Sequence, residues 1–509
     1  MKIFRKIFTR MHLTLFLLFL QMVALGVFAG WIVRASVVVY YVGVVVSILV
    51  FSFVLKKDEA AVYKITWLVV VLAFPSVGGV LYLFFGNKRP VRRISAHVKQ
   101  HALIAKLLDA DGNLPFINQI QCGRMYSLMQ YIRSLSSYHA YRNTETKYYP
   151  MGELMFEDML AEIEKAEKFI FLEFFIIKSG KMWDALLDLL AKKAAEGVEV
   201  RLIVDHLGSH RLFTRAYLRE IRKLGIRVMR FNPMVPFLLL FMNNRDHRKI
   251  LVVDGKVAFT GGINIADEYI NVQRRFGIWK DTGLRLRGDA VWSFTLMFIE
   301  MWDTFCKQDE HISDYEAYKV KSHDGIATDG FVIPYGDSPL DNEQLAENVY
   351  VDILSQAEHY VYIFTPYLII SEKFVSALQL TAKRGVDVRI ITPGIPDKKL
   401  VFRLTRSYYR YLLEAGVKIY EYSSGFLHAK SMVCDDEIAV VGTINLDYRS
   451  LYLHFECAAL LYNVSVIKDI RDDALRVAED GRQVALTPVR WRLWNDLLEA
   501  VLHLFAPLM

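Results

Sequence analysis

Cysteine is scarce in this chain. Its 509 residues include four cysteines, and none of them stands in a C-x-x-C pair. A long chain with this spacing argues against a disulfide framework and against a zinc site built on cysteines. We therefore expect reduced thiols, two of them within apolar strands. The four are Cys122, Cys306, Cys434 and Cys457.

Charged residues are also few, and they are unevenly distributed. The chain is 23% charged and 53% hydrophobic, with a mean hydropathy of +0.23, and most of the apolar excess lies in the first 90 residues. The length predicts two to four domains rather than one core. The net charge of +7 suits an anionic partner, either nucleic acid or a membrane rich in acidic lipid. Charge alone leaves both open.

Three stretches lack charge altogether: 13–33, 35–55 and 65–86. Each is long enough to cross a bilayer, so residues 1–90 are expected to form a transmembrane segment. A cleaved signal peptide would explain only the first stretch. Basic clusters flank both ends of the segment. The denser one opens a basic linker expected over 91–145 and favours a cytoplasmic location for the bulk of the chain.

Beyond residue 145, strands alternate with amphipathic helices, which predicts an α/β fold. The pattern also repeats, since "LAKKAAEGVEVRLIVD" (190–205) matches "LTAKRGVDVRIITP" (380–393). A long unit that occurs twice indicates a duplicated domain, with two halves that meet about a pseudo-twofold axis. The expected ranges are 146–306 for domain 1, 307–345 for an inter-domain linker, 346–480 for domain 2 and 481–509 for a C-terminal amphipathic segment.

Each half closes with the pattern H-x-K-x4-D. An extended chain points the histidine and the lysine to the same face. A lone copy would suit a buried histidine beside a lysine, but two copies inside a repeat argue against that interpretation. An asparagine follows seventeen residues after each histidine. The residues are His247, Lys249, Asp254 and Asn264 in the first half and His428, Lys430, Asp435 and Asn445 in the second.

These residue types suit the cleavage of a phosphodiester. A neutral imidazole can attack phosphorus, and a second, protonated imidazole can protonate the leaving alkoxide. The two lysines and the two asparagine amides would stabilise the phosphoryl oxygens. Asp281 and Glu456 are candidates for fixing the histidine tautomers. Asp254 and Asp435 are expected to shape the hairpin after each motif, and no metal is required.

The doubled motif and the stretch "RDHRKILVVDGKVAFTGGINIADEY" resemble the phospholipase D superfamily, and in particular its bacterial cardiolipin synthase branch. "AFPSVGGVLYLFFGNKR" is similar to that family's amino-terminal module, and "RWRLWNDLLEAVLHLFAPLM" to its closing segment. The resemblance implies two tandem phospholipase D-like α/β domains after transmembrane helices. It also implies that the six residues of the two H-x-K-x4-D triplets are catalytic.

The activity implied is transfer of a phosphatidyl group from one phosphatidylglycerol to another, without a cofactor. The products would be cardiolipin and glycerol, formed through a phosphatidyl-histidine. The location implied is the bacterial cell membrane, multi-pass, with cytoplasmic catalytic domains facing an anionic bilayer. Family members commonly have two amino-terminal spans, whereas three apolar stretches occur here, so the topology stays open. Family precedent favours the first histidine as nucleophile, although the repeat treats both alike.

Several alternatives remain. A hydrolytic phospholipase D or a phosphatidylserine synthase would use the same histidines. The unrelated synthases that use a CDP-activated donor need aspartates in membrane helices, and the apolar stretches contain none. A nuclease is disfavoured by those stretches and by "NPMVPFLLLFMNN" (232–244), so no nucleic-acid partner is expected. That segment is either a buried strand or a part that dips into the bilayer. The stretch 489–509 is either a docked helix or an interfacial anchor.

Overall fold

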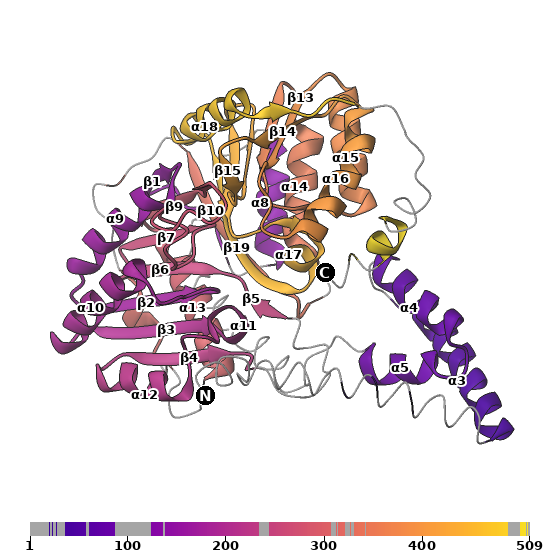
Figure 1. Ribbon diagram of the computed structural model, residues 1–509. Helices are drawn as coiled ribbons and strands as arrows, with labels where there is room; N and C mark the ends of the chain where they lie inside the picture. Colours follow the sequence, from indigo (N-terminus) through magenta and orange to yellow (C-terminus); the bar gives the residue numbers. More distant parts are fainter. Residues whose placement is uncertain are drawn as a thin grey trace. The chain divides into compact units, whose positions relative to one another are not determined.

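Figure 1 shows the helices and strands of the computed structural model. The described residues divide into two compact units: one contains the helices of residues 36–86 and the helical residues 499–504, and the other contains all remaining helices and strands. The structure describes residues 36–57, 61–86, 124–135, 138–233, 244–306, 314–320, 330–341, 343–486 and 499–504, with single residues at 20, 23, 27, 312, 326 and 506.

The first unit is built on apolar helices. These are α3 (Val37–Lys56), α4 (Ala61–Ala73) and α5 (Gly78–Phe85). Within the described residues, α3 alone is long and apolar enough to cross a membrane. Its 20 residues span about 30 Å, the thickness of the hydrocarbon core. The backbone N–H of Gly79 donates to Ser47 Oγ at 2.9 Å, so small residues let α5 pack closely on α3.

The expected span 65–86 needs a correction. The helix ends at Ala73 and resumes only at Gly78, because Pro75 lies between them. Proline disfavours the helical conformation of the residue before it and cannot donate a backbone hydrogen bond. The expected span 13–33 lies outside the described residues, apart from Leu20, Val23 and Val27.

The first half of the repeat forms a lobe around a seven-stranded sheet of order β1-β9-β7-β6-β2-β3-β4. Its strands are β1 (Thr144–Tyr149), β2 (Phe169–Phe174), β3 (Glu199–Asp205), β4 (Arg227–Phe231), β6 (Lys249–Val253), β7 (Val257–Gly261) and β9 (Gly283–Gly288). Its helices are α9 (Gly152–Glu164), α10 (Lys181–Ala195), α11 (His206–Ser209), α12 (Arg215–Lys223) and α13 (Val291–Phe305).

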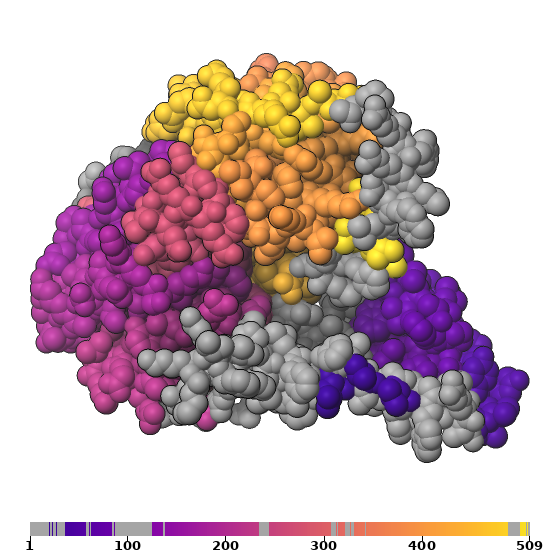
Figure 2. Space-filling view, in the orientation of Figure 1, coloured from indigo at the N-terminus to yellow at the C-terminus, as the bar shows by residue number. Residues whose placement is uncertain are grey.

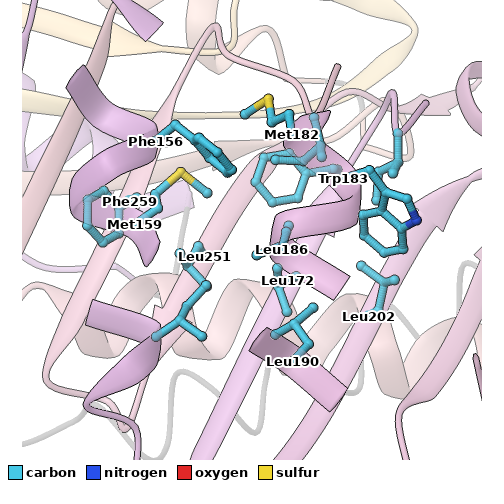
Figure 3. Packing of buried hydrophobic residues seen from close by; sticks show 14 of the residues in the cluster. Phe156, Met159, Leu172, Met182, Trp183, Leu186, Leu190, Leu202, Leu251 and Phe259 are labelled. Carbon is cyan, nitrogen blue, oxygen red and sulfur yellow. The ribbon is translucent and has the colours of Figure 1, made fainter. Parts of the chain in front are cut away.

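Both faces of this sheet are buried at its central strands β2, β6 and β7, which explains why these strands are mostly apolar. On one face, Leu172 of β2 joins a core with α9 and α10, seen in Figure 3. Successive residues of a strand point to opposite faces. Phe171 accordingly stacks on Phe298 of α13, with ring centroids 4.4 Å apart.

The second half forms a lobe around a sheet of order β10-β19-β17-β16-β11-β13-β14-β20. Its strands are β10 (Phe331–Asp337), β11 (Tyr360–Phe364), β13 (Asp387–Pro393), β14 (Lys418–Tyr422), β16 (Ser431–Cys434), β17 (Ile438–Gly442), β19 (His454–Tyr462) and β20 (Arg482–Gln483). Its helices are α14 (Leu345–Gln356), α15 (Glu372–Lys383), α16 (Lys399–Leu413), α17 (Tyr448–Tyr452) and α18 (Ile467–Asp480).

The strand orders of the two lobes correspond, β1 with β10, β9 with β19, and so on to β4 with β14. The duplicated α/β domain is therefore confirmed. The described cysteines Cys306, Cys434 and Cys457 form no disulfide with one another, and the last two lie buried in β16 and β19, as expected. Cys122 lies outside the described residues.

Two domain boundaries differ from expectation. The stretch 307–345, expected as a linker, contains β10, which pairs with β19. Pro334 lies within β10, which is tolerated because this is an edge strand. The expected basic linker 91–145 contains α8 (Arg124–Leu135), which packs on α14 of the second lobe. Tyr131 of α8 donates its hydroxyl to Glu343 Oε1 at 2.6 Å.

The lobes are joined by two short parallel pairings. β5 (Arg245–Asp246) of the first lobe pairs with the start of β19, and β8 (Ile278–Lys280) pairs with β15 (Gly425–Leu427) of the second. Figure 2 shows the first lobe, in purple to pink, in direct contact with the second, in orange to yellow. β5 and β15 immediately precede the two motif histidines, so both motifs lie where the lobes meet.

Candidate active site

The backbone of each motif histidine is attached to the opposite lobe. The N–H of His247 donates to the carbonyl of Phe455 at 2.9 Å, and the N–H of His428 donates to the carbonyl of Lys280 at 2.7 Å. Both acceptors belong to the short pairings between the lobes. The same connections that join the lobes therefore position the two imidazoles.

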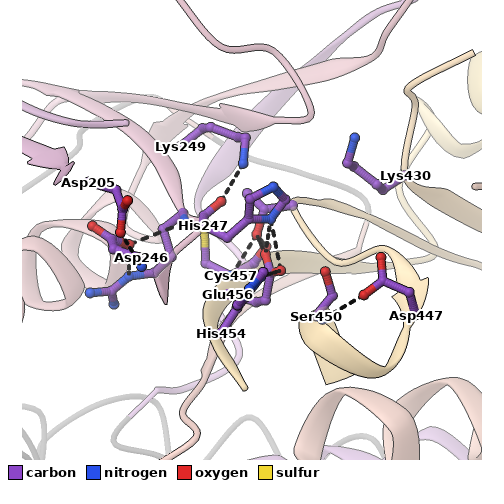
Figure 4. A network of polar contacts seen from close by, with 12 residues as sticks. Asp205, Asp246, His247, Lys249, Lys430, Asp447, Ser450, His454, Glu456 and Cys457 are labelled. Carbon is purple, nitrogen blue, oxygen red and sulfur yellow. Dashed lines mark hydrogen bonds and ion pairs between the residues drawn. The ribbon is translucent and has the colours of Figure 1, made fainter. Parts of the chain in front are cut away.

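Each motif imidazole contacts a carboxylate that comes from the opposite lobe. His247 Nδ1 lies 2.8 Å from Glu456 Oε1 of the second lobe, a contact shown by dashed lines in Figure 4. His428 Nδ1 lies 2.7 Å from Asp281 Oδ2 of the first lobe. At His247 the carboxylate favours the tautomer with the proton on Nδ1, so the Nε2 lone pair is available for reaction. Nδ1 of His428 also lies 2.7 Å from Lys430 Nζ, so two groups contact that nitrogen.

Both imidazoles are buried and kept neutral. Burial lowers the pKa of His247 well below its ordinary value, and the charges of Lys249 and Lys430 lower it further. Burial and Lys430 lower the pKa of His428 to about 4, against the opposing effect of Asp281. The charges of both motifs thus act on each ring. At neutral pH the site without substrate holds two uncharged imidazoles.

The two motif lysines are buried, and their pKa values lie well below that of an exposed lysine. Burial lowers the pKa of Lys249 to about 8, partly offset by Glu456. It lowers the pKa of Lys430 to about 7, partly offset by Asp281. Each ammonium donates to the carbonyl of its own motif histidine. A bound anion would favour the charged forms of both lysines.

The aspartates that end the motifs contact backbone. Asp254 and Asp435 adopt left-handed φ values of 51° and 53° in the turns after β6 and β16, a conformation that aspartate tolerates. Each carboxylate accepts three backbone N–H groups from the start of a neighbouring strand. The donors are Glu167, Lys168 and Phe169 for Asp254, and Glu358, His359 and Tyr360 for Asp435.

The two asparagines differ in their surroundings. Asn264 Oδ1 accepts from the N–H of Ile176 at 3.0 Å, and its amide donates to the Tyr269 hydroxyl at 2.8 Å. Asn445 is also buried, but its Oδ1 has no hydrogen-bond partner among the described residues. The equal sequence spacing therefore does not give the two amides equal contacts.

A third histidine, which the motif analysis missed, lies beside the first. His454 opens β19, and its ring centroid is 5.5 Å from that of His247. Burial lowers the pKa of His454 to about 3. In "YLHFECAAL" it stands two residues before Glu456, and the alternation of a strand puts both on one face. That spacing is the signal that could have identified it.

A buried ion pair between Arg248 and Glu173 lies next to the first motif histidine. Arg248 Nε lies 2.6 Å from Glu173 Oε1 of β2 and 3.6 Å from Asp246 Oδ1. Nearby charges of Glu173 and Asp246 raise the pKa of Arg248 despite its burial. Removing one member of such a pair leaves an uncompensated buried charge. Asp246 and Arg248, the two neighbours of His247 in the sequence, thus hold the motif strand in place through this ion pair.

Comparison with known proteins assigns this architecture to a family. The description "Cardiolipin synthase, PLD-like domain" matches residues 159–279 and 350–477. A cardiolipin synthase of Geobacillus sp. is 35% identical over 470 residues, which cover 91% of this chain and 92% of that one. One of Alkalihalophilus pseudofirmus is 34% identical, covering 95% and 96%. The chain belongs to the phospholipase D-like cardiolipin synthase family.

Further similarities agree with this family assignment. The description "Phospholipase D-nuclease N-terminal" matches residues 44–87 of this cardiolipin synthase family member. The crystal structure of phosphatidylserine synthase from Haemophilus influenzae has a TM-score of 0.53 at 15% identity, covering 71% of this chain and 93% of that one. At this identity the likeness concerns the fold alone.

Proposed function

We propose that the protein is a cardiolipin synthase that transfers a phosphatidyl group between two molecules of phosphatidylglycerol. The observation that carries the proposal is the reciprocal pair of imidazole–carboxylate contacts between the lobes. Two buried lysines accompany these pairs, so an anionic phosphodiester would find both nucleophile and counter-charge. Family membership supports the choice of a phospholipid substrate.

In the first step, Nε2 of His247 attacks phosphorus, and the bond from phosphorus to the glycerol headgroup breaks. Glu456 holds the proton on Nδ1, so the Nε2 lone pair can form the new bond. The departing glycerol oxygen takes a proton from His428, which acts as general acid. Lys249 and Lys430 stabilise the phosphoryl oxygens as charge develops on them.

In the second step, a hydroxyl of another phosphatidylglycerol attacks the phosphatidyl-histidine. Neutral His428 accepts the hydroxyl proton as the new phosphorus–oxygen bond forms, and the bond to His247 breaks. The product is cardiolipin, and both histidines return to their starting states. Water in place of the second lipid would give phosphatidic acid, which is the hydrolytic alternative.

We assign the nucleophile to His247 because the two histidines differ in their electrostatics. Lys249 and Lys430 both disfavour the protonated form of His247. Asp281 partly restores the basicity of His428, whose pKa is about 4. A bound phosphodiester raises both values, and His428 then takes up a proton first. Different protonation states of two like groups are what this acid–base mechanism requires.

In this proposal the aspartates Asp254 and Asp435 hold the motif turns rather than touch substrate. Asn264 and Asn445 lie beside the site as supporting residues. The apolar helix α3 attaches the enzyme to the bacterial cell membrane, with the catalytic lobes at its anionic cytoplasmic face. The segment 232–244, proposed to approach acyl chains, lies outside the described residues except at its two ends.

A product assay tests the proposal. Purified protein is added to vesicles of phosphatidylglycerol, and cardiolipin, phosphatidic acid and glycerol are measured over time. We expect cardiolipin and glycerol in equal amounts. The His428→Asn variant should be inactive, whereas the same change at the exposed His359 should have no effect. Phosphatidic acid as the sole lipid product would instead identify a hydrolase.

A further inference from the structure

We propose that His247, His454 and Glu456 form a site for a transition-metal dication of the Zn²⁺ class, and that the bound metal switches off the enzyme. The site itself depends only on these three side chains. The inhibition rests on the proposed function, because it assigns the attack on phosphorus to His247.

The geometry points to a ligand that bridges the three side chains. His454 is only 9% exposed, yet neither of its ring nitrogens has a hydrogen-bond partner among the described residues. Its Nδ1 lies 3.8 Å from Glu456 Oε1, too far for a good hydrogen bond. Figure 4 shows His454 and His247 at the same carboxylate. One ligand atom from each residue lies within 4.8 Å of the others.

The donor set fits the metal proposed. Two imidazoles and one glutamate are a known zinc ligand set, with bonds of about 2.0–2.2 Å and a fourth position for water. Such bonds place ligand atoms about 3.3 Å apart, so small side-chain rotations would complete the site. Calcium and magnesium prefer oxygen ligands alone, which argues against them here.

Two nearby groups set the strength of binding. Lys249 and Lys430 both act on the ring of His247, and their positive charges oppose a cation. We therefore expect half-saturation by Zn²⁺ in about the micromolar range, weaker than in structural zinc sites. Such a site would fill only when free metal rises and would empty when a chelator is added.

The chemical consequence follows from the tautomer of His247. A metal bound at Nδ1 takes the position of the proton shared with Glu456. The neutral ring then carries its proton on Nε2, so that nitrogen has no lone pair with which to attack phosphorus. The metal also removes the Glu456 carboxylate from its role as orienting partner. Binding should therefore lower kcat rather than merely raise KM.

Cobalt titration tests the site without any use of activity. Tag-free full-length protein in detergent is titrated with Co²⁺, whose d–d absorption in the visible range reports nitrogen and oxygen ligands in a four-coordinate site. We expect one saturable band that Zn²⁺ displaces. The band should be lost in His454→Asn and retained in the matched control His359→Asn, whose side chain is exposed. Circular dichroism confirms that each variant is folded.

Inhibition is then measured with Zn²⁺ on phosphatidylglycerol vesicles. His454→Asn should raise the inhibitory concentration at least tenfold relative to the parent and the control, and EDTA should restore activity. An unchanged cobalt band in folded His454→Asn would overturn the proposed site, whether or not the variant turns over lipid. A lost band with unchanged zinc inhibition would overturn the switch while leaving the metal site. Absence of synthase activity with a normal cobalt band would count against the proposed function alone.

Discussion

Glu456 lies 209 residues after His247 in the sequence, yet its Oε1 is 2.8 Å from the Nδ1 of that imidazole. Asp281 completes the exchange by holding His428, 147 residues later. Each lobe therefore supplies the histidine of one pair and the carboxylate of the other. Neither lobe contains a complete histidine–carboxylate pair, so the candidate site requires both lobes.

Replacing Glu456 by glutamine should lower kcat by about 10³-fold or more. A glutamine amide can donate to Nδ1 and so stabilise the wrong imidazole tautomer, as in other orienting-carboxylate replacements. Initial rates on phosphatidylglycerol vesicles measure the effect. The control is Glu164→Gln, at an exposed residue of α9. A loss of less than threefold in Glu456→Gln would show that the carboxylate has no orienting role.

Asp435→Asn should act on folding more than on chemistry. The carboxylate accepts three backbone N–H groups at the start of β11, and bonds to a charged acceptor contribute about 1.5–3 kcal/mol each. We expect the free energy of unfolding to fall by about 2–4 kcal/mol, measured by denaturant titration. The neighbouring Asp436→Asn change should cost less, because that carboxylate accepts from two side chains near the surface, the Tyr360 hydroxyl and the Arg471 guanidinium. Equal effects would argue against this role for Asp435.

The pH dependence should show the depressed pKa of the lysines. The pKa of Lys430 is about 7 in the protein without substrate, so its ammonium is lost as the pH rises through that value. We therefore expect kcat/KM, which reports the free enzyme, to decline above about pH 7. Bound phosphodiester raises the lysine pKa, so kcat should decline only at higher pH. A kcat/KM that stays constant to about pH 9 would contradict this assignment.

Lys430→Met should abolish activity and stabilise the protein without substrate. The folded pKa of Lys430 is below its unfolded value, so the unfolded chain binds more protons between about pH 7 and 10 and stability rises with pH there. At about pH 6 the buried ammonium is charged and unfavourable, and its removal should add about 1–3 kcal/mol to the free energy of unfolding.

Thermal unfolding across this pH range measures the effect, with Lys256→Met, at an exposed residue of the turn after β6, as the control. The rise in stability with pH should be smaller in Lys430→Met than in the parent. A destabilised Lys430→Met variant would indicate that the ammonium stabilises the fold through its contacts.

The α/β duplication could be predicted from sequence because strand and helix periodicity is local. Repeated stretches such as 190–205 and 380–393 fall on equivalent helix–strand pairs. The exchange of Asp281 and Glu456 between lobes could not be predicted in the same way, because it depends on how the lobes pair. The sequence identifies both carboxylates as candidates. Which histidine each one contacts depends on the pairing of β5 and β8 with strands of the second lobe.

Three further features, β10, the helix break at Pro75 and the position of His454, were not predicted from the sequence, each for a different physical reason. β10 lies in the stretch 307–345, whose many Asp, Ser, Gly and His residues favour a linker, and Pro334 is tolerated within it because β10 is an edge strand. The break at Pro75 shows that an uninterrupted apolar stretch need not form one helix. His454 was missed because it belongs to no repeated motif and acquires its position only through the contact of β19 with the first lobe.

The most direct test of the shared site is to trap the phosphatidyl-enzyme. A phosphatidyl p-nitrophenyl ester, labelled at its phosphorus atom, has a leaving group that needs no proton, so it separates the nucleophile from the general acid. In His428→Ala the label should accumulate and map to the peptide containing His247 after an alkaline quench. His247→Ala should take up none. Label on His247→Ala, or label located at His428 in the parent enzyme, would contradict the account.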